Sequence, residues 1–203
     1  MEWNFSAIPL ERPEIVEVIR NRFPDITPDY RRIDALKYIE AGNIVGVLVE
    51  CGSNGEVSFV IDNWKPLKQT GMYEEALLFA LTDTLVNLYH VPLKTLHFLL
   101  EQADRNKLIA EGDNLPDGEN FTLYRGVSGH GVARRLRGIS WTSNPDRAKW
   151  FACRFDELAK PAVFRAEVPR ELVYAYNEDK HESEFICLIP RDLKLRCVWK
   201  EGE

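Results

Sequence analysis

A loop near the middle of the chain separates two regions with different hydrophobic patterns. Residues 112–120 read Gly-Asp-Asn-Leu-Pro-Asp-Gly-Glu-Asn, a concentration of turn-forming residues. Ahead of this loop the apolar residues mostly recur at helical spacing, and after it β-branched and aromatic runs dominate. The sequence therefore predicts an α+β protein, with a largely helical region over 1–112 and a strand-rich fold over 121–203.

The first region is expected to be helical except for one hairpin. Its pattern predicts helices over 13–22, 27–41, 73–88 and 93–109. Two β-rich runs, Ile44–Cys51 and Glu56–Ile61, are joined by Gly-Ser-Asn-Gly, and Asn-Gly between such runs is a hairpin signal. We therefore expect a β-hairpin over 44–61.

The second region is expected to contain six strands and one helix. The strands are predicted near 121–125, 139–143, 162–168, 172–176, 183–189 and 194–199. Asn144 is a good N-cap, and Pro145 and Asp146 suit the first turn of a helix that reaches roughly Phe155.

The charge of the chain is negative overall but uneven. A net charge of −6 argues against a general nucleic-acid binder. Residues 1–120 carry 11 Lys/Arg and 20 Asp/Glu, whereas residues 121–203 carry 15 and 12. The basic surplus in the second region would suit a ligand that bears a diphosphate, and a solvated surface with chance asymmetry explains it almost as well.

The cysteines and the N-terminus bear on location. The four cysteines form no CxxC pair, and Cys51, Cys187 and Cys197 lie in apolar or alternating runs, where a buried free thiol is expected. No hydrophobic signal peptide follows Met1, and no apolar stretch approaches the roughly 18 residues of a membrane span. These features predict a protein of the reducing cytoplasm that does not engage a membrane.

Several classes of site lack their motifs. The four histidines show no metal-ligand spacing with each other or with cysteine, and no serine lies in a GxSxG turn. No GxGxxG run leads from a strand into a helix. We therefore expect no metal site, no hydrolase triad and no hydride-transferring dehydrogenase.

Two polar positions of the second region lie on predicted strands. Arg125 ends a strand and precedes Gly126; such an arginine can fork two hydrogen bonds onto a phosphate or ribose, and glycine lets a ligand approach the backbone. A salt bridge across the sheet is the alternative role for Arg125. Ser140 and Thr142 alternate with apolar residues, so both hydroxyls share one strand face. An edge strand with its polar side in water gives the same pattern.

A third polar piece consists of two carboxylates. On an extended strand Glu182 and Glu184 would point to the same side, where like charges raise the cost of ionising both. Such a pair is useful for stabilising a cationic transition state and activating an acceptor. A solvated acidic hairpin is equally consistent with the sequence.

Taken in chain order, these pieces resemble the Arg–Ser–Glu class of mono-ADP-ribosyltransferases, which includes arginine-specific toxins and ecto-enzymes. The resemblance covers about 121–199. Arg125 matches the family's first-strand arginine, and 140–142, Ser-Trp-Thr, matches its Ser-Thr-Ser strand with tryptophan in place of the middle threonine. Residues 182–184, Glu-Ser-Glu, match its Glu-x-Glu motif. Ala148 and Phe151 fall where the family has an alanine and then an aromatic residue.

The resemblance implies a fold, a co-substrate and residue roles. The fold would be an ADP-ribosyltransferase-like split β-sandwich over 121–203, and NAD would be the co-substrate. Arg125 and Gly126 would bind NAD, and we include the flanking Tyr124 and Thr142 among the NAD-binding residues.

The same resemblance assigns the catalytic residues. Ser140 would orient Glu184, and Glu184 would hold the 2′-hydroxyl of the nicotinamide ribose and stabilise the oxocarbenium ion. Glu182 would activate or position the acceptor, an arginine guanidinium in family members with this pattern. We expect the acceptor to be a protein, with nucleic acid left open.

Other functions remain compatible with these residues. An NAD glycohydrolase would use the same site with water as acceptor, and an inactive member of the fold would serve as a binding module. Transfer of an RNA 2′-phosphate to NAD fits the two glutamates poorly. A toxin, a phage-encoded modifier and a bacterial housekeeping modifier would all carry the same residues.

Overall fold

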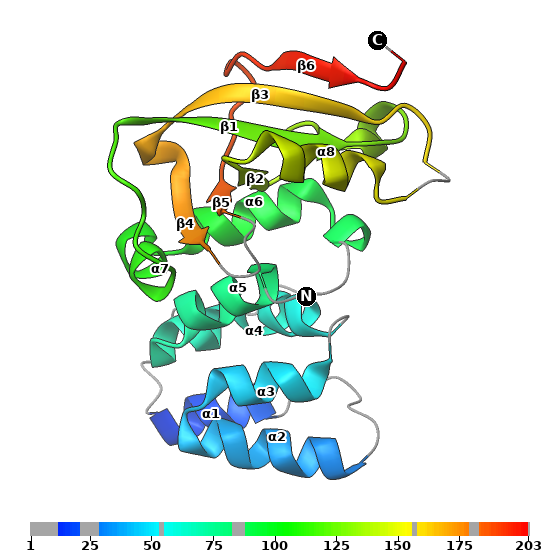
Figure 1. The fold of residues 1–203 in the computed structure, drawn as a ribbon. Helices are drawn as coiled ribbons and strands as arrows, with labels where there is room; N and C mark the ends of the chain where they lie inside the picture. Colours follow the sequence, from blue (N-terminus) through cyan, green and yellow to red (C-terminus); the bar gives the residue numbers. More distant parts are fainter. Residues whose placement is uncertain are drawn as a thin grey trace. The chain divides into compact units, whose positions relative to one another are not determined.

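The computed structural model describes residues 12–20, 29–52, 55–82, 88–155, 158–178 and 183–202. Contacts between residues divide the chain into two units, Met1–Leu88 and Tyr89–Glu203 (Figure 1). The protein combines helices with an antiparallel sheet, so the α+β prediction is confirmed.

The described part of the first unit is helical. Its five helices are α1 (Arg12–Arg20), α2 (Asp29–Ala41), α3 (Ile44–Cys51), α4 (Glu56–Thr70) and α5 (Tyr73–Thr82). The predictions of α1, α2 and α5 are confirmed within the described residues, although part of each predicted range, including 83–87, lies outside them.

The predicted hairpin over 44–61 is wrong, because both of its runs are helices. Helix α3 buries Ile44, Val47 and Leu48, which lie three and four residues apart and therefore share one helical face. The Asn43 side chain caps this helix by accepting a hydrogen bond of 2.8 Å from the Gly46 N–H. The β-branched composition of the run suggested strands, but the spacing of the buried residues is helical.

Two helices expected as one open the second unit. Helix α6 (Leu93–Gln102) ends before Asp104, whose Oδ1 accepts from the N–H groups of Asn106 (3.0 Å) and Lys107 (3.3 Å) and thereby starts α7 (Arg105–Glu111). The Arg105 guanidinium donates to the carbonyls of Val173 (2.7 Å) and Arg170 (2.6 Å). These bonds tie α7 to the strand-rich part of the same unit.

All six predicted strands are present. They are β1 (Asn120–Val127), β2 (Ser140–Thr142), β3 (Ala162–Pro169), β4 (Val173–Asn177), β5 (Glu184–Cys187) and β6 (Arg196–Lys200). They form one antiparallel sheet in the order β4-β5-β2-β1-β3-β6. Strands β1 and β3 pair along their full lengths, from Asn120 opposite Pro169 to Val127 opposite Ala162.

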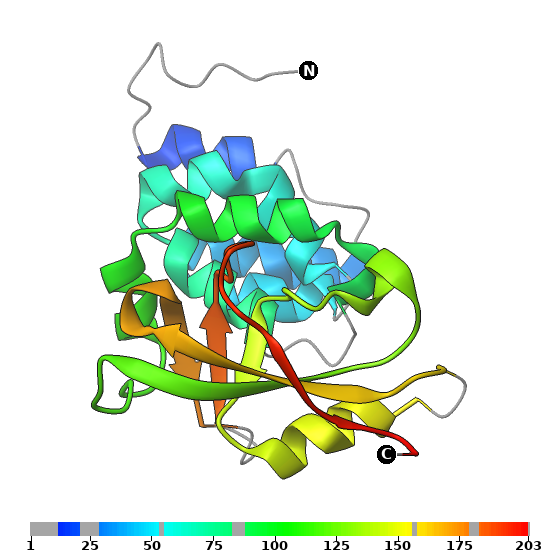
Figure 2. The same cartoon turned by 90° about the horizontal axis from the view of Figure 1, so that it is seen from above.

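The sheet is nearly split between β1 and β2. Only Tyr124 and Thr142 pair across these two strands. Figure 2 shows that β1, β3 and β6 run across the direction of β4 and β5. The sheet therefore consists of two three-stranded halves that meet at one residue pair.

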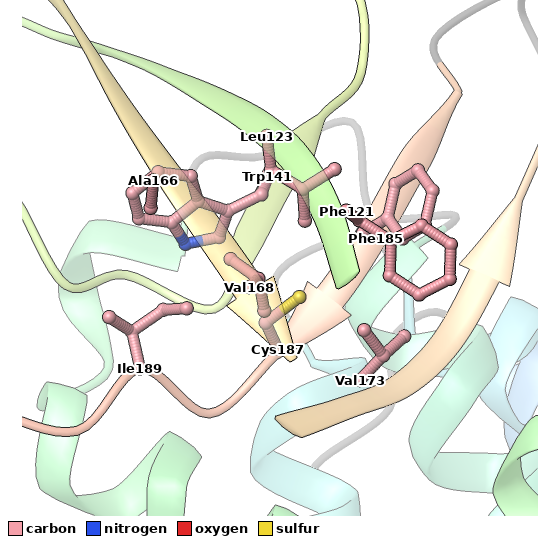
Figure 3. Packing of buried hydrophobic residues seen from close by; sticks show 9 residues of the cluster. All are labelled: Phe121, Leu123, Trp141, Ala166, Val168, Val173, Phe185, Cys187 and Ile189. Carbon is pink, nitrogen blue, oxygen red and sulfur yellow. The ribbon is translucent and has the colours of Figure 1, made fainter. Parts of the chain in front are cut away.

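Both halves contribute to one hydrophobic cluster. Its nine buried residues, drawn in Figure 3, are Phe121, Leu123, Trp141, Ala166, Val168, Val173, Phe185, Cys187 and Ile189. The Trp141 side chain is 1% exposed, and its Nε1–H donates to the Gly138 carbonyl at 2.8 Å, so the indole's one polar group is satisfied. Burial of this cluster holds the two halves of the sheet together.

Helix α8 (Pro145–Cys153) covers the opposite face of β1. The Asn144 Oδ1 accepts from the N–H groups of Asp146 (2.9 Å) and Arg147 (3.2 Å), so the predicted N-cap is confirmed. Ala148 and Ala152 pack with Val163 of β3.

The cysteines differ in exposure. Cys187 is buried and Cys51 is half-buried, whereas Cys153 and Cys197 are exposed. The prediction of a buried Cys197 is therefore wrong, because β6 is the edge strand of the sheet and leaves the residue at the surface. None of the helices in the described ranges is long and apolar enough to cross a membrane.

The cap of α8 can be tested by Asn144→Ala. The substitution removes the acceptor for two N–H groups and should lower the free energy of unfolding by about 0.5–2 kcal/mol. Urea denaturation measures this change. Asn114→Ala, at an exposed loop position, is the matched control and should change stability by less than about 0.5 kcal/mol. Equal losses in both variants would contradict the capping role.

The thiols should differ in reactivity. Burial, with the carboxylates of Glu56 and Glu50 nearby, raises the pKa of Cys51 to about 12, and burial, followed by the Glu184 carboxylate, raises the pKa of Cys187. A raised thiol pKa means that the reactive thiolate is scarce at pH 8. A thiol reagent at that pH should therefore modify Cys153 and Cys197 quickly in the folded protein, and mass spectrometry should find Cys51 and Cys187 unmodified. Rapid labelling of Cys187 would contradict its burial.

Candidate functional site

A hydrogen bond joins two of the predicted catalytic residues. The Ser140 hydroxyl donates to the Glu184 Oε1, and both residues are half-buried. Strands β2 and β5 pair with Thr142 opposite Glu184 and Ser140 opposite Ile186. Ser140 and Glu184 are therefore diagonal neighbours on one face of the sheet, which is within reach of their side chains.

The Arg125 guanidinium contacts the backbone of the same serine, although Arg125 leaves β1 on the side of the buried Leu123, opposite to the Ser140 side chain. Its Nη1 donates to the Ser140 carbonyl at 2.5 Å, and its Nε donates to the Arg135 carbonyl at 3.1 Å. The Ile139 carbonyl accepts from the Cys187 N–H of the neighbouring chain segment, so the next carbonyl, that of Ser140, points toward β1. Strand β1 does not pair with β2 at Ser140. The Arg125 side chain therefore donates to the Ser140 carbonyl in place of a backbone N–H of β1.

The loop that receives Arg125 was not identified from the sequence. A Cβ atom on Gly138 would lie 2.2 Å from Arg125 Nη2, so any side chain there would displace the guanidinium from this position. Gly138 and the Arg135 carbonyl thus form the binding surface for the Arg125 side chain. No short sequence motif predicts these contacts, because they join segments that meet only in the folded sheet.

Gly126 has a different neighbour from the one expected. A Cβ atom there would lie 1.8 Å from the Ala148 carbonyl oxygen and 2.6 Å from the Ala152 nitrogen. The backbone of α8 therefore fills the space in front of this glycine, which accounts for the residue without a ligand. A contact between the Gly126 backbone and NAD stays a prediction.

Four predicted site residues share a face of the sheet. Tyr124 lies opposite Thr142, and Thr142 lies opposite Glu184, so these side chains form a row across three strands to which Ser140 is adjacent. Tyr124 is half-buried against the α8 cluster, and the Thr142 Oγ1 accepts from the Asn144 N–H at 3.0 Å. Asn177 extends the row because it lies opposite Glu184 on β4. Its position follows from strand register, which the sequence did not supply.

The expected Glu182–Glu184 pair is not part of one extended strand. Strand β5 begins at Glu184, and Ser183 has a φ of +42°, in the left-handed region. The extended strand on which the predicted shared side of the two carboxylates rests therefore does not include Ser183. Glu182 itself lies outside the described residues.

Polar contacts hold both ends of the segment that joins β4 to β5. The Glu178 carboxylate accepts from the Ser183 hydroxyl at 3.1 Å and from the Tyr176 hydroxyl, and the Glu178 N–H donates to Asp113 Oδ2 at 2.7 Å. The Ser183 carbonyl accepts from the Ser143 N–H at 3.3 Å. The start of β5, and with it Glu184, is thus anchored to the end of β2.

Comparisons with protein-family models, with curated proteins and with solved structures find no match to this chain. Within the described ranges, no three His, Cys, Asp or Glu side chains gather as a metal site would require. What the site does must therefore be argued from its own geometry.

The packing role of Gly126 can be tested by Gly126→Ala. The added methyl group would collide with the backbone of α8, which cannot rotate away, so unfolding free energy should fall by at least about 3 kcal/mol. Chemical denaturation gives the value. Gly129→Ala is the control: its Cβ meets nothing within 4 Å, and only the left-handed φ of +84° opposes it, at about 1 kcal/mol. A Gly126→Ala protein as stable as the Gly129→Ala protein would contradict the contact.

Proposed function

We propose that the protein is a mono-ADP-ribosyltransferase that consumes NAD. The observation that carries the proposal is the hydrogen bond from the Ser140 hydroxyl to the Glu184 carboxylate, with the Arg125 guanidinium on the carbonyl of the same serine. These residues come from three segments far apart in the sequence, and their order and partnership match the Arg–Ser–Glu pattern. The hydrogen bond gives Glu184 a fixed orientation, which an anion that stabilises a transition state needs.

The chemistry requires one such anion. The bond between the nicotinamide nitrogen and C1′ of the ribose breaks, and its electron pair leaves with neutral nicotinamide. The ribose then carries the positive charge of an oxocarbenium ion, which the Glu184 carboxylate stabilises while it accepts a hydrogen bond from the 2′-hydroxyl. Glycosidases use fixed carboxylates against the same kind of cation.

The remaining residues would bind and orient NAD. Arg125 would contact a phosphate or ribose of NAD and would give up one of its present contacts to do so. Tyr124 and Thr142 lie in the same row as Glu184 and would line the site. Gly126 would contribute through its backbone.

The acceptor completes the reaction. Its nucleophilic atom attacks C1′ and loses a proton, which joins ADP-ribose to the acceptor. Glu182 would take that proton or position the acceptor, and the contacts of Glu178 and Ser183 would hold the ends of the segment that carries it. We propose a protein side chain such as arginine as the acceptor.

Release of nicotinamide tests the proposal. Purified full-length protein incubated with NAD should liberate nicotinamide, quantified by chromatography, and Glu184→Gln should lower kcat by about 100-fold or more because the fixed anion is lost. Glu171→Gln changes an exposed glutamate in the 3-10 turn Arg170–Leu172 and is the matched control, which should retain the wild-type rate. Both variants should unfold at the wild-type temperature within a few degrees.

The product distinguishes the transferase from its alternatives. Covalent ADP-ribose on protein, detected by mass spectrometry of a protein mixture incubated with NAD, is the expected result. Free ADP-ribose alone would identify a glycohydrolase with the same site. No nicotinamide release, or equal rates for wild type and Glu184→Gln, would refute catalysis by this site.

A further inference from the structure

A surface depression lies at the β3–β6 edge of the sheet. A depression of about 210 Å³ is lined by Arg165, Ala166, Glu167, Leu193, Lys194 and Arg196. Three of its lining side chains are cationic and one is a carboxylate. None of these residues belongs to the Ser140–Glu184 site.

Two of the cations lie directly opposite each other. Arg165 of β3 pairs with Arg196 of β6 in the antiparallel register, so both side chains leave the same face of the sheet. Like charges at directly opposed positions destabilise a pair of strands. Lys194 adds a third positive charge at the same depression. An anion bound between these groups would remove the repulsion.

The single carboxylate compensates only one of the three cations. Arg165 Nη2 donates to Glu167 Oε1 at 2.5 Å, and Glu167 also accepts from the Thr122 hydroxyl at 3.0 Å. Arg196 and Lys194 have no carboxylate partner within the described ranges.

The wall of the depression opposite β3 is held in place. The Arg137 guanidinium donates to the carbonyls of Pro190 (2.5 Å), Arg191 (2.7 Å) and Leu193 (3.0 Å). Three bonds from one side chain fix the turn that precedes Lys194. The cations therefore project from a braced turn and a paired strand, which lowers the entropic cost of binding a ligand.

We infer that this depression binds a phosphomonoester. Three cations against one carboxylate leave two positive charges, which match the two negative charges of a phosphomonoester dianion. Arginine forks match the tetrahedral oxygens of phosphate. The Glu167 carboxylate already pairs with Arg165. A ligand must therefore carry a strong negative charge of its own to compete for the cations of the depression.

The register also relates this site to the first one. Arg165 lies opposite Tyr124, which continues the row through Thr142 to Glu184 on the same face of the sheet. Three strand spacings separate Arg165 from Glu184, about 14 Å along the sheet. Phosphate binding at this depression would not depend on the proposed transferase activity and can be measured without NAD.

Titration of the full-length protein tests the site. Isothermal calorimetry at constant ionic strength should show methyl phosphate binding at one site of the wild type. Arg196→Gln should raise the Kd about tenfold or more, because a charged hydrogen-bonding partner is lost. Without ligand, Arg196→Gln should raise the melting temperature by about 1–4 °C, since the opposed like charges are gone. A gain of stability together with a loss of binding is not expected from a substitution that merely damages the fold.

Two controls distinguish a specific binding site from nonspecific attraction to positive surface charge. Arg191→Gln removes an exposed cation that does not line the depression and should leave Kd within about twofold of wild type. Dimethyl phosphate, a monoanion of similar shape, should bind at least about tenfold more weakly than methyl phosphate. No binding by the wild type, equal losses in both arginine variants, or equal affinity for the two phosphates would overturn the inference.

Discussion

The burial of Trp141 is the constraint on which the candidate site depends. Its indole lies in the cluster shared by both halves of the sheet, and the alternation of the strand then places Ser140 and Thr142 on the opposite face. Phe185 and Cys187 enter the same cluster from β5 and leave Glu184 on the face of Ser140. The hydrophobic core thus sets which way the polar residues point. Tryptophan at the middle of this short strand is consistent with that arrangement, because the middle side chain faces the core.

The near-split of the sheet explains why Arg125 lies where it does. Strands β1 and β2 pair at Tyr124 and Thr142 and then diverge, which leaves the Ser140 carbonyl without a strand partner on that side. A partly buried carbonyl is stabilised by a donor, and the Arg125 guanidinium supplies one. Gly138 lets the Arg125 guanidinium approach the backbone, and Gly126 lets the backbone of α8 approach β1. The structural role of the arginine and its proposed ligand-binding role therefore involve the same side chain.

The sequence predicted the strand-rich region better than the helical one, for physical reasons. After residue 120 buried and less buried positions alternate along strands such as β1 and β4, and turn residues separate the strands, so the pattern identifies them. The run Ile44–Cys51 is apolar throughout, and such a run does not distinguish a strand from a buried helix. The break at Asp104 did leave a signal, since aspartate is a good N-cap, but the apolar spacing continued through it. The partners of Arg125, and the place of Asn177 beside Glu184, follow from strand register, which a single sequence does not encode locally.

Placement of the dinucleotide is the most direct test of the central claim that Arg125, Ser140 and Glu184 form one NAD site. A crystal structure of the protein with a non-hydrolysable NAD analogue would locate the nicotinamide ribose. The account predicts its 2′-hydroxyl within hydrogen-bonding distance of the Glu184 carboxylate, with the Ser140–Glu184 hydrogen bond retained and Arg125 near the diphosphate. An analogue bound at another surface, with Glu184 untouched, would contradict the account.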